Sequence, residues 1–150
     1  MMLSPNFSLE ELTRSDIAAR KGLDNAPNAS EIANLSRLAA FLEEIREHLV
    51  CPIMINSGFR SKAVNDAVGS HDTSQHRLGC AADIRVSQKT PERLMKAIYD
   101  SKLPYDQLIL EFADGRGGGW VHVSIPNKPD TAPRHQALVI NRGGVFMYNG

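Results

Sequence analysis

Apolar residues recur at three- and four-residue steps along one segment in the first third of the chain. The repeat begins after Ser30 and continues to about Leu49, so a helix over these residues would have one apolar and one polar face. The pattern predicts a long helix that packs its apolar face against a sheet. The repeating positions are Ile32, Leu35, Leu38, Ala39, Leu42, Ile45 and Leu49.

Capping and helix-ending residues predict three shorter helices. Ser8 and Glu11 form the Ser-x-x-Glu pattern of a capping box, and the apolar positions that follow extend to Ile17. A second helix is expected over 61–68, where a glycine ends it. A third begins at Thr90, before a proline, because proline at the first helical position loses no needed donor.

Five short apolar segments bounded by turn residues predict β-strands. The glycine-rich loop at 114–119 turns the chain back, so the simplest connection of its flanking strands is an antiparallel hairpin. This loop lacks the Gly-x-x-x-x-Gly-Lys pattern of a phosphate loop. The last strand is expected at an edge of the sheet and ends at Gly143-Gly144. The five segments are 52–56, 80–86, 107–112, 120–124 and 136–140.

Helices that precede and alternate with strands, together with a hairpin near the end, predict the α+β class. We expect a mainly antiparallel sheet with helices packed on one side. A length of 150 residues fits a single domain over 1–150. The segment after Pro126 is rich in Pro, Lys and Asp and is expected to cross the surface before the last strand.

Charge and composition exclude several classes of function. Lys plus Arg and Asp plus Glu both total 17, so the basic excess typical of nucleic-acid-binding proteins is missing. No segment approaches the roughly 20 apolar residues of a membrane span, and the first residues lack a signal-peptide pattern. We therefore expect synthesis in the cytoplasm without membrane insertion.

Cys51 and Cys80 are expected as two buried thiols. The oligomeric state stays open, with a monomer as the expectation.

Two histidines and one aspartate form a candidate metal site. His76 follows a polar loop, Asp83 lies in the next strand, and His122 lies in a later strand. Two imidazoles and one carboxylate are a common ligand set for catalytic zinc, because three protein ligands leave a position for water or a substrate oxygen. Each residue alone also fits an ordinary structural role, and His71 competes for the metal position.

The surrounding motifs resemble those of a known family. They are Ser57-Gly58-Phe59-Arg60-Ser61 with Asn65, then Ser74-x-His76-x-x-Gly79-x-Ala81-x-Asp83, and then Trp120-x-His122-x-Ser124. In this order they resemble the zinc D-Ala-D-Ala carboxypeptidases and endolysin peptidases, over residues 7–124. The resemblance implies an α+β fold with a Zn²⁺ ion on the sheet, bound by His76, Asp83 and His122.

Three other residues are candidates for contact with the substrate. The guanidinium of Arg60 suits a carboxylate, and the resemblance implies that it holds an acid group of the substrate beside the metal. Ser74 is placed either to hydrogen-bond the substrate or to cap its loop. Trp120 either forms a wall of the cleft or packs in the core, and core packing is the simpler interpretation.

Peptide hydrolysis also needs a general acid/base. In part of the family an acidic residue lies three positions before the last histidine, but that position is Gly119 here. Glu111 is the nearest acidic residue in the expected sheet, and a hairpin that opposes it to His122 would place both on one face. A register shifted by one residue would point Glu111 away. A structural ion pair with Arg116 or Lys102 is the alternative. Weaker candidates for the base are Asp106 and Asp114.

These features predict a zinc-dependent peptidase that acts on the peptidoglycan stem peptide of bacterial cell walls. Cleavage as a D,D-carboxypeptidase and as an L,D-endopeptidase both remain open. The expected setting is a phage or prophage lysin that reaches the wall once it is released. The alternative from another class is an inert wall-binding or phage structural module that retains the metal site, and Gly119 motivates it.

Overall fold

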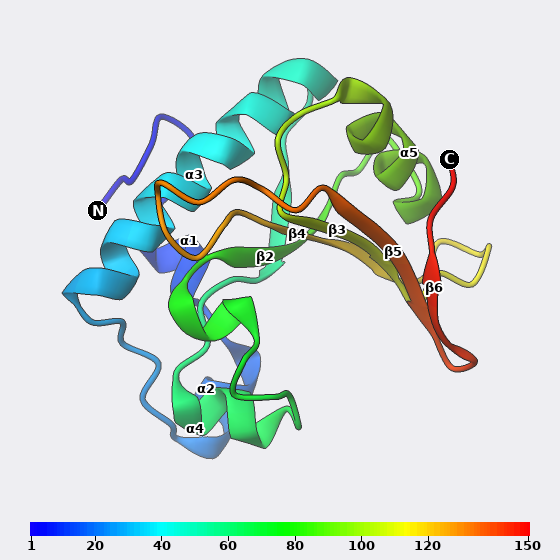
Figure 1. Ribbon diagram of the computed structural model, residues 1–150. Coiled ribbons are helices and arrows are strands. Elements are labelled where there is room, and N and C mark those ends of the chain that lie inside the picture. Colours follow the sequence, from blue (N-terminus) through cyan, green and yellow to red (C-terminus); the bar gives the residue numbers. More distant parts are fainter.

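Six strands form one sheet in the order β1-β2-β4-β3-β5-β6 in the computed structural model, which describes all 150 residues (Figure 1). The strands are β1 (Met54–Ser57), β2 (Ala81–Arg85), β3 (Gln107–Glu111), β4 (Trp120–Ser124), β5 (Gln136–Asn141) and β6 (Gly144–Met147). The helices are α1 (Leu9–Thr13), α2 (Asp16–Lys21), α3 (Ala29–Leu49), α4 (Lys62–Ala67), α5 (Pro91–Ser101) and the short 3₁₀ helix η1 (Gln75–Leu78). None of these helices has the length and apolar character needed to cross a membrane.

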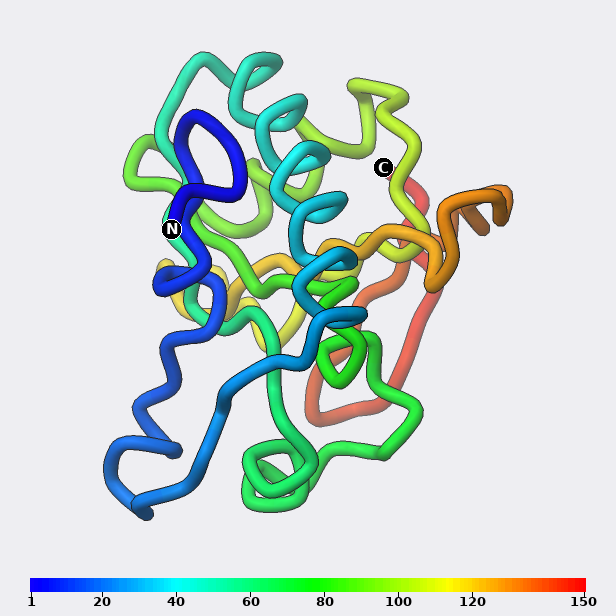
Figure 2. Tube along the Cα trace, turned by 90° about the vertical axis from the view of Figure 1, so that its left-hand side faces the viewer, coloured from blue at the N-terminus to red at the C-terminus, as the bar shows by residue number.

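The sheet is mainly antiparallel, as the sequence predicts. Only β3 and β5 run parallel, because the chain crosses from β4 through residues 126–135 before it returns beside β3. Figure 2 shows this crossing segment, in orange, projecting from one side of the molecule. The α+β class and the hairpin formed by β3 and β4 are therefore confirmed.

The last strand of the sheet was not predicted. The segment 136–140 is not an edge strand, because β5 lies between β3 and β6. Gly143 and Gly144 do not end the sheet either. Gly143 lies in the turn of a β5–β6 hairpin, where its backbone N donates a hydrogen bond to Asn141 Oδ1 at 2.8 Å, and Gly144 begins β6 opposite Asn141. The edge strand β6 is short and its apolar side chains are exposed, so it has no alternating pattern that would predict a strand.

Helices α3 and α5 cover one face of the sheet (Figure 1). Strand residues alternate between the two faces, so Ala82 and Ile84 enter this core while Asp83 points to the other face. Both cysteines are buried free thiols, as expected. Helices α2 and α4 lie on the opposite side of the sheet and leave the rest of that face open (Figure 1). The open face carries the polar strand residues.

The N-terminal helices begin at residues that satisfy their free backbone donors. Ser8 Oγ accepts a hydrogen bond from Glu11 N at 3.0 Å and caps α1. The expected single helix through Ile17 is instead two helices, because Ser15 caps α2 separately. Helix α3 begins one residue earlier than predicted, where Asn28 and the side chain of the third helical residue form a complete capping box.

Candidate metal centre and active-site cleft

Three side chains from different elements meet on the open face of the sheet. His76 lies on η1, and Asp83 lies directly opposite His122 in the pairing of β2 with β4. Asp83 Oδ1 lies 3.1 Å from His122 Nδ1 and 3.3 Å from His76 Nε2. All three residues are buried, with exposed fractions of 3% for His76, 6% for Asp83 and 8% for His122. The predicted set is thus brought together in one cluster.

The ring of His76 is oriented by the backbone. Its Nδ1 lies 2.7 Å from the carbonyl oxygen of Gly58, which can only accept a hydrogen bond, so Nδ1 carries the proton. The lone pair of Nε2 then faces Asp83. A histidine that ligates a metal usually donates its other ring N–H to such a carbonyl or carboxylate. His76 therefore has the orientation of a metal ligand.

The loop that carries His76 is held against helix α3 at Gly79. A Cβ atom at this position would lie 2.8 Å from the carbonyl oxygen of Glu31, and the backbone has a φ of +79°. Glycine alone meets both requirements without strain. The close neighbours at this glycine, Glu31 and Leu35, both belong to helix α3.

The cluster has the donor set of a zinc site. One ligand atom from each of His76, Asp83 and His122 lies within 4.8 Å of the others, as needed for a shared ion. His122 turns its Nδ1 toward the cluster, and its Nε2 is buried without a protein hydrogen-bond partner. His71 is exposed and lies outside the cluster. The residues present therefore fit a zinc ion.

The Asp83 carboxyl is stabilised in its ionised form. Burial raises the pKa of Asp83, but the positive charge that His76 and His122 carry when protonated, together with the hydrogen bond from His122, lowers it by more, so the pKa lies below its usual range. Arg60 Nη2 adds a contact to the second carboxylate oxygen at 3.4 Å. An ionised carboxylate is the form that binds a metal.

Glu111 reaches this cluster from strand β3, although not in the predicted register. Glu111 lies opposite Trp120, and Ile109 lies opposite His122. The expected direct pairing of Glu111 with His122 is therefore wrong by two residues. A shift of two keeps Glu111 on the same face of the sheet, because side chains alternate with a period of two. Its Oε2 lies 3.8 Å from His122 Nδ1.

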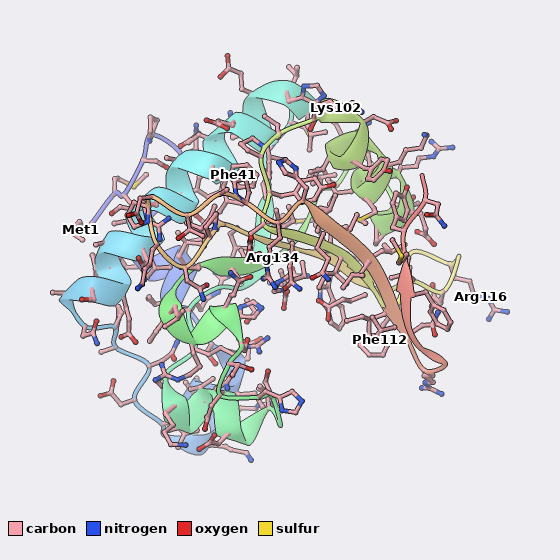
Figure 3. The ribbon with its side chains drawn as sticks, in the orientation of Figure 1. Met1, Phe41, Lys102, Phe112, Arg116 and Arg134 are labelled. Carbon is pink, nitrogen blue, oxygen red and sulfur yellow. The ribbon has the colours of Figure 1, made fainter.

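The surroundings of Glu111 stabilise the protonated form of its carboxyl more than bulk water would. Burial raises the pKa of Glu111, and the charge of Asp83 raises it further. The indole Nε1 of Trp120 donates a hydrogen bond to Oε2 at 3.2 Å. The alternative partners, Arg116 and Lys102, lie at the periphery of the molecule and make no ion pair with Glu111 (Figure 3). A carboxyl with a raised pKa beside the cluster has the character of a general acid/base.

The structure explains why position 119 carries no acidic residue. Gly119 has a φ of +89°, and a Cβ atom there would lie 2.6 Å from both Glu111 O and Ala113 N. Any side chain at this position would collide with the backbone of the preceding strand. The only acidic side chains that line the cleft are therefore those of Asp83 and Glu111.

The weaker candidates for the base are occupied elsewhere. The carboxylate of Asp106 accepts hydrogen bonds from Arg134 and Gln75, outside the cluster. Asp114 lies in the exposed turn before β4, where its carboxylate accepts two backbone N–H groups. Glu111 is the remaining acidic candidate.

The predicted substrate-contact residues line one cleft of about 590 Å³ together with the cluster. Arg60 Nε donates to Ser57 Oγ at 3.2 Å, which directs the guanidinium toward Asp83. Ser74 caps η1, since its Oγ accepts from His76 N at 3.3 Å, and it also faces the cleft. Trp120 is half-buried in the cleft wall, with its ring tilted by 42° against the ring of Phe112, so the interpretation as a core residue is wrong.

Several cleft residues were not identified from the sequence. Strand β5 contributes Leu138 and Ile140, β6 contributes Val145, and the crossing segment contributes Arg134. The alternation of residues 136–140 is a signal for the first two, because Leu138 and Ile140 share a face. No local pattern indicates that Arg134 turns inward. The cleft thus has one polar wall around η1 and one apolar wall on β5 and β6.

Comparison with known families covers most of the chain. The sequence profile described as Peptidase M15 matches residues 5–124, which include the cluster, Arg60 and Glu111. Strands β5 and β6 lie outside the matched residues. A search of curated proteins returns no match.

Proposed function

Because the chain belongs to the Peptidase M15 family of zinc metallopeptidases, we propose that it hydrolyses peptide bonds in the stem peptide of bacterial peptidoglycan. The observation that carries this proposal is the meeting of the His76–Asp83–His122 cluster with Glu111 in one cleft. In this proposal the three cluster residues hold the zinc ion. A zinc ion held there would supply Lewis acidity, which would activate a water molecule and polarise the scissile carbonyl.

Glu111 is the general acid/base of the proposed reaction. Its carboxylate takes a proton from the attacking water and then gives that proton to the leaving amine. The 3.8 Å between its Oε2 and His122 Nδ1 places the carboxylate beside the cluster. The partly buried position of Glu111 supports the second half of this role, because burial raises the pKa of its carboxyl and so favours the form that donates a proton.

Arg60 binds a carboxylate of the substrate in this proposal. Its contact with Asp83 is long, at 3.4 Å, and uses one of the five N–H donors of the guanidinium. The contact to Ser57 uses a second donor. The remaining donors are available to a planar carboxylate that approaches through the cleft. Ser74 is proposed to hydrogen-bond the same substrate through its hydroxyl group.

The proposal includes both a D,D-carboxypeptidase and an L,D-endopeptidase. Its setting as a phage or prophage lysin that acts on the wall after release rests on the resemblance to endolysin peptidases. The rival function, an inert wall-binding or phage structural module, was motivated by Gly119. Glu111 beside His122 argues against that rival, because the cluster does have a neighbouring carboxylate.

Digestion of purified peptidoglycan by the zinc-loaded protein tests the proposal. New amino ends, located by mass spectrometry of the released fragments, would support it and identify the bond. The matched control is His76→Ala, which should release no fragments. Binding to wall sacculi without any new amino ends would favour the inert module and contradict the peptidase.

A further inference from the structure

A second arginine faces the cleft from outside the cluster. Arg134 ends the crossing segment just before β5 and lines the same cleft as His76 and Glu111. Figure 3 shows it near the middle of the molecule, between the η1–α4 region and β5. Its side chain is 54% exposed, whereas the side chain of its partner Asp106 is only 5% exposed. The guanidinium is therefore anchored on a buried carboxylate and open on its other side.

The anchoring fixes the direction of the guanidinium. Arg134 Nε and Nη2 donate to Asp106 Oδ2 at 3.1 and 2.7 Å, and the backbone N donates to Oδ1 at 2.9 Å. Gln75 Nε2 donates to the same Oδ2 at 3.1 Å and holds the carboxylate in place. Arg134 Nη1 makes no hydrogen bond to the protein. Two N–H donors are thus held in a fixed position at the cleft.

The free Nη1 side of the Arg134 guanidinium is not needed to hold the crossing segment in place. The other end of the segment is already held by Arg37, whose guanidinium donates to Pro126 O at 3.2 Å. At the Arg134 end, the backbone bond to Asp106 and the β5 pairing hold the chain. The remaining acidic residues of the cleft, Asp83 and Glu111, make no contact with Arg134. Nη1 is therefore free to donate to a ligand in the cleft.

Strand geometry gives the position of Arg134 relative to the cluster. Its anchor Asp106 precedes β3, and Ile109 is the β3 residue opposite His122. Three residues of a strand span roughly 10 Å. Glu111 lies on the other side of Ile109, and Arg60 lies near β1 and β2. The two guanidinium groups therefore face the cleft from different sides, with the cluster between them.

We propose that Arg134 forms a second carboxylate-binding subsite, for a peptide that carries a free carboxylate two or three residues from the bond that is cut. This inference rests on the proposed function and specifies its substrate. Arg60 holds the carboxylate next to the scissile bond, and Arg134 holds the next one along the peptide. A stem peptide has such a pair, since both its C-terminus and its γ-linked D-glutamate carry free carboxylates.

Paired amidation of the peptide tests the subsite. Two analogues of a synthetic stem pentapeptide are needed, one with the C-terminal carboxylate as the amide and one with the D-glutamate α-carboxylate as the amide. Affinities are measured by calorimetry in a Glu111→Gln background, and kcat/KM is measured with the zinc-loaded wild type. Loss of the carboxylate that Arg134 binds should weaken binding about tenfold, as expected for a charge-assisted hydrogen bond.

Substitution of Arg134 should remove this preference and leave the preference for the other carboxylate unchanged. In Arg134→Gln, one of the two amidated peptides should bind as well as the free acid, while the other still binds more weakly. The matched control is Arg116→Gln, an outward-facing arginine that should retain both preferences (Figure 3). Asp106→Asn loosens the same anchor but keeps the positive charge, so it should retain part of the preference. The subsite would be overturned if Arg134→Gln showed the same preferences as the wild type. It would also be overturned if Arg134→Gln and Asp106→Asn both lost affinity for all three peptides to the same degree.

The subsite and the proposed function fail in different ways. A wild type that binds the peptides with an Arg134-dependent preference but releases no product would contradict the peptidase and support the subsite. A wild type that cuts the free acid and both amides with the same kcat/KM would support the peptidase and overturn the subsite.

Discussion

Asp83 and His122 lie directly opposite each other on adjacent antiparallel strands, and Oδ1 of the first is 3.1 Å from Nδ1 of the second. The pairing of β2 with β4 therefore fixes two of the three candidate metal ligands before any loop is considered. The third, His76, is delivered by η1 and oriented by the carbonyl of Gly58. A change of strand register by one residue would turn Asp83 into the core and dismantle the site.

Loss of any cluster residue should empty the metal site. We expect His76→Ala, Asp83→Ala and His122→Ala to lose zinc, because one of three protein ligands supplies a large part of the binding free energy. Elemental analysis of the purified variants measures this. The controls are the histidines outside the cluster, His48, His71 and His135, whose alanine variants should keep zinc. A full site in His76→Ala together with an empty site in His71→Ala would reverse the assignment.

Glu111→Gln should keep both the fold and the metal but lose turnover. The amide has nearly the same size as the carboxylate, and it cannot take a proton from the attacking water. General acid/base catalysis contributes about 10²- to 10⁴-fold, so kcat should fall by that factor. Peptide cleavage is followed by chromatography with zinc content measured in parallel. The control is Asp114→Asn, an exposed carboxylate of the turn before β4. Near-normal turnover of the Gln variant would exclude Glu111 as the base.

Gly119→Ala should destabilise the protein more than Gly117→Ala. Both glycines have nearly the same positive φ, at +89° and +88°, so both substitutions strain the backbone. Only at Gly119 does the new Cβ also collide with backbone atoms, at 2.6 Å, whereas nothing lies within 4 Å of it at Gly117. We expect a loss of about 1 kcal/mol for Gly117→Ala and of more than about 3 kcal/mol for Gly119→Ala. Urea unfolding measures the difference, and equal losses would show that position 119 has room for a side chain.

The ion pair of Asp106 with Arg134 should contribute to stability only above acid pH. Burial raises the pKa of the Asp106 carboxyl, but Arg134 lowers it further, so the folded-state pKa lies below the unfolded value. A depressed pKa stabilises the folded state above the unfolded pKa of about 3.9, and this contribution disappears as the pH falls through the folded-state pKa. Asp106→Asn should therefore be less stable than the wild type at pH 7, by about 1–2 kcal/mol because Arg134 is half exposed.

Urea unfolding between pH 7 and pH 2.5 measures this dependence. The difference between wild type and Asp106→Asn should stay constant down to about pH 4 and shrink below it. The control is Asp130→Asn, an exposed aspartate of the same crossing segment, which should differ little from the wild type at any pH. A difference that grows toward low pH would contradict the assigned direction of the shift.

Local patterns predict the cluster but not all of its surroundings. Alternation along 80–86 places Asp83 on the face opposite to Ala82 and Ile84, and the structure agrees. The register of Glu111 could not be predicted, because residues 112–119 form a long connection and only short turns fix a hairpin register. Phe112 at the start of this connection has a φ of +54°, a backbone conformation that its sequence does not indicate.

Long-range contacts explain what the sequence alone does not show. The inward direction of Arg134 depends on Asp106, which is 28 positions away in the chain. Strand β6 forms because its backbone pairs with β5, although its side chains stay exposed. In both cases the stabilising partner lies outside the local segment. Periodicity and capping patterns describe neighbours in sequence, so they do not identify such partners.

Two hydrogen bonds connect residues 58–60 to His76, and so connect the proposed substrate-binding segment to a candidate metal ligand. His76 Nδ1 donates to Gly58 O at 2.7 Å, and Arg60 N donates back to His76 O at 2.9 Å. This reciprocal pair links the segment of Arg60 to the segment of the metal ligand. A ligand that restricts the motion of one segment would, through these bonds, also restrict the other. We therefore expect occupancy of the metal position and affinity for a carboxylate at Arg60 to be thermodynamically linked, so that each ligand would strengthen the binding of the other by the same factor.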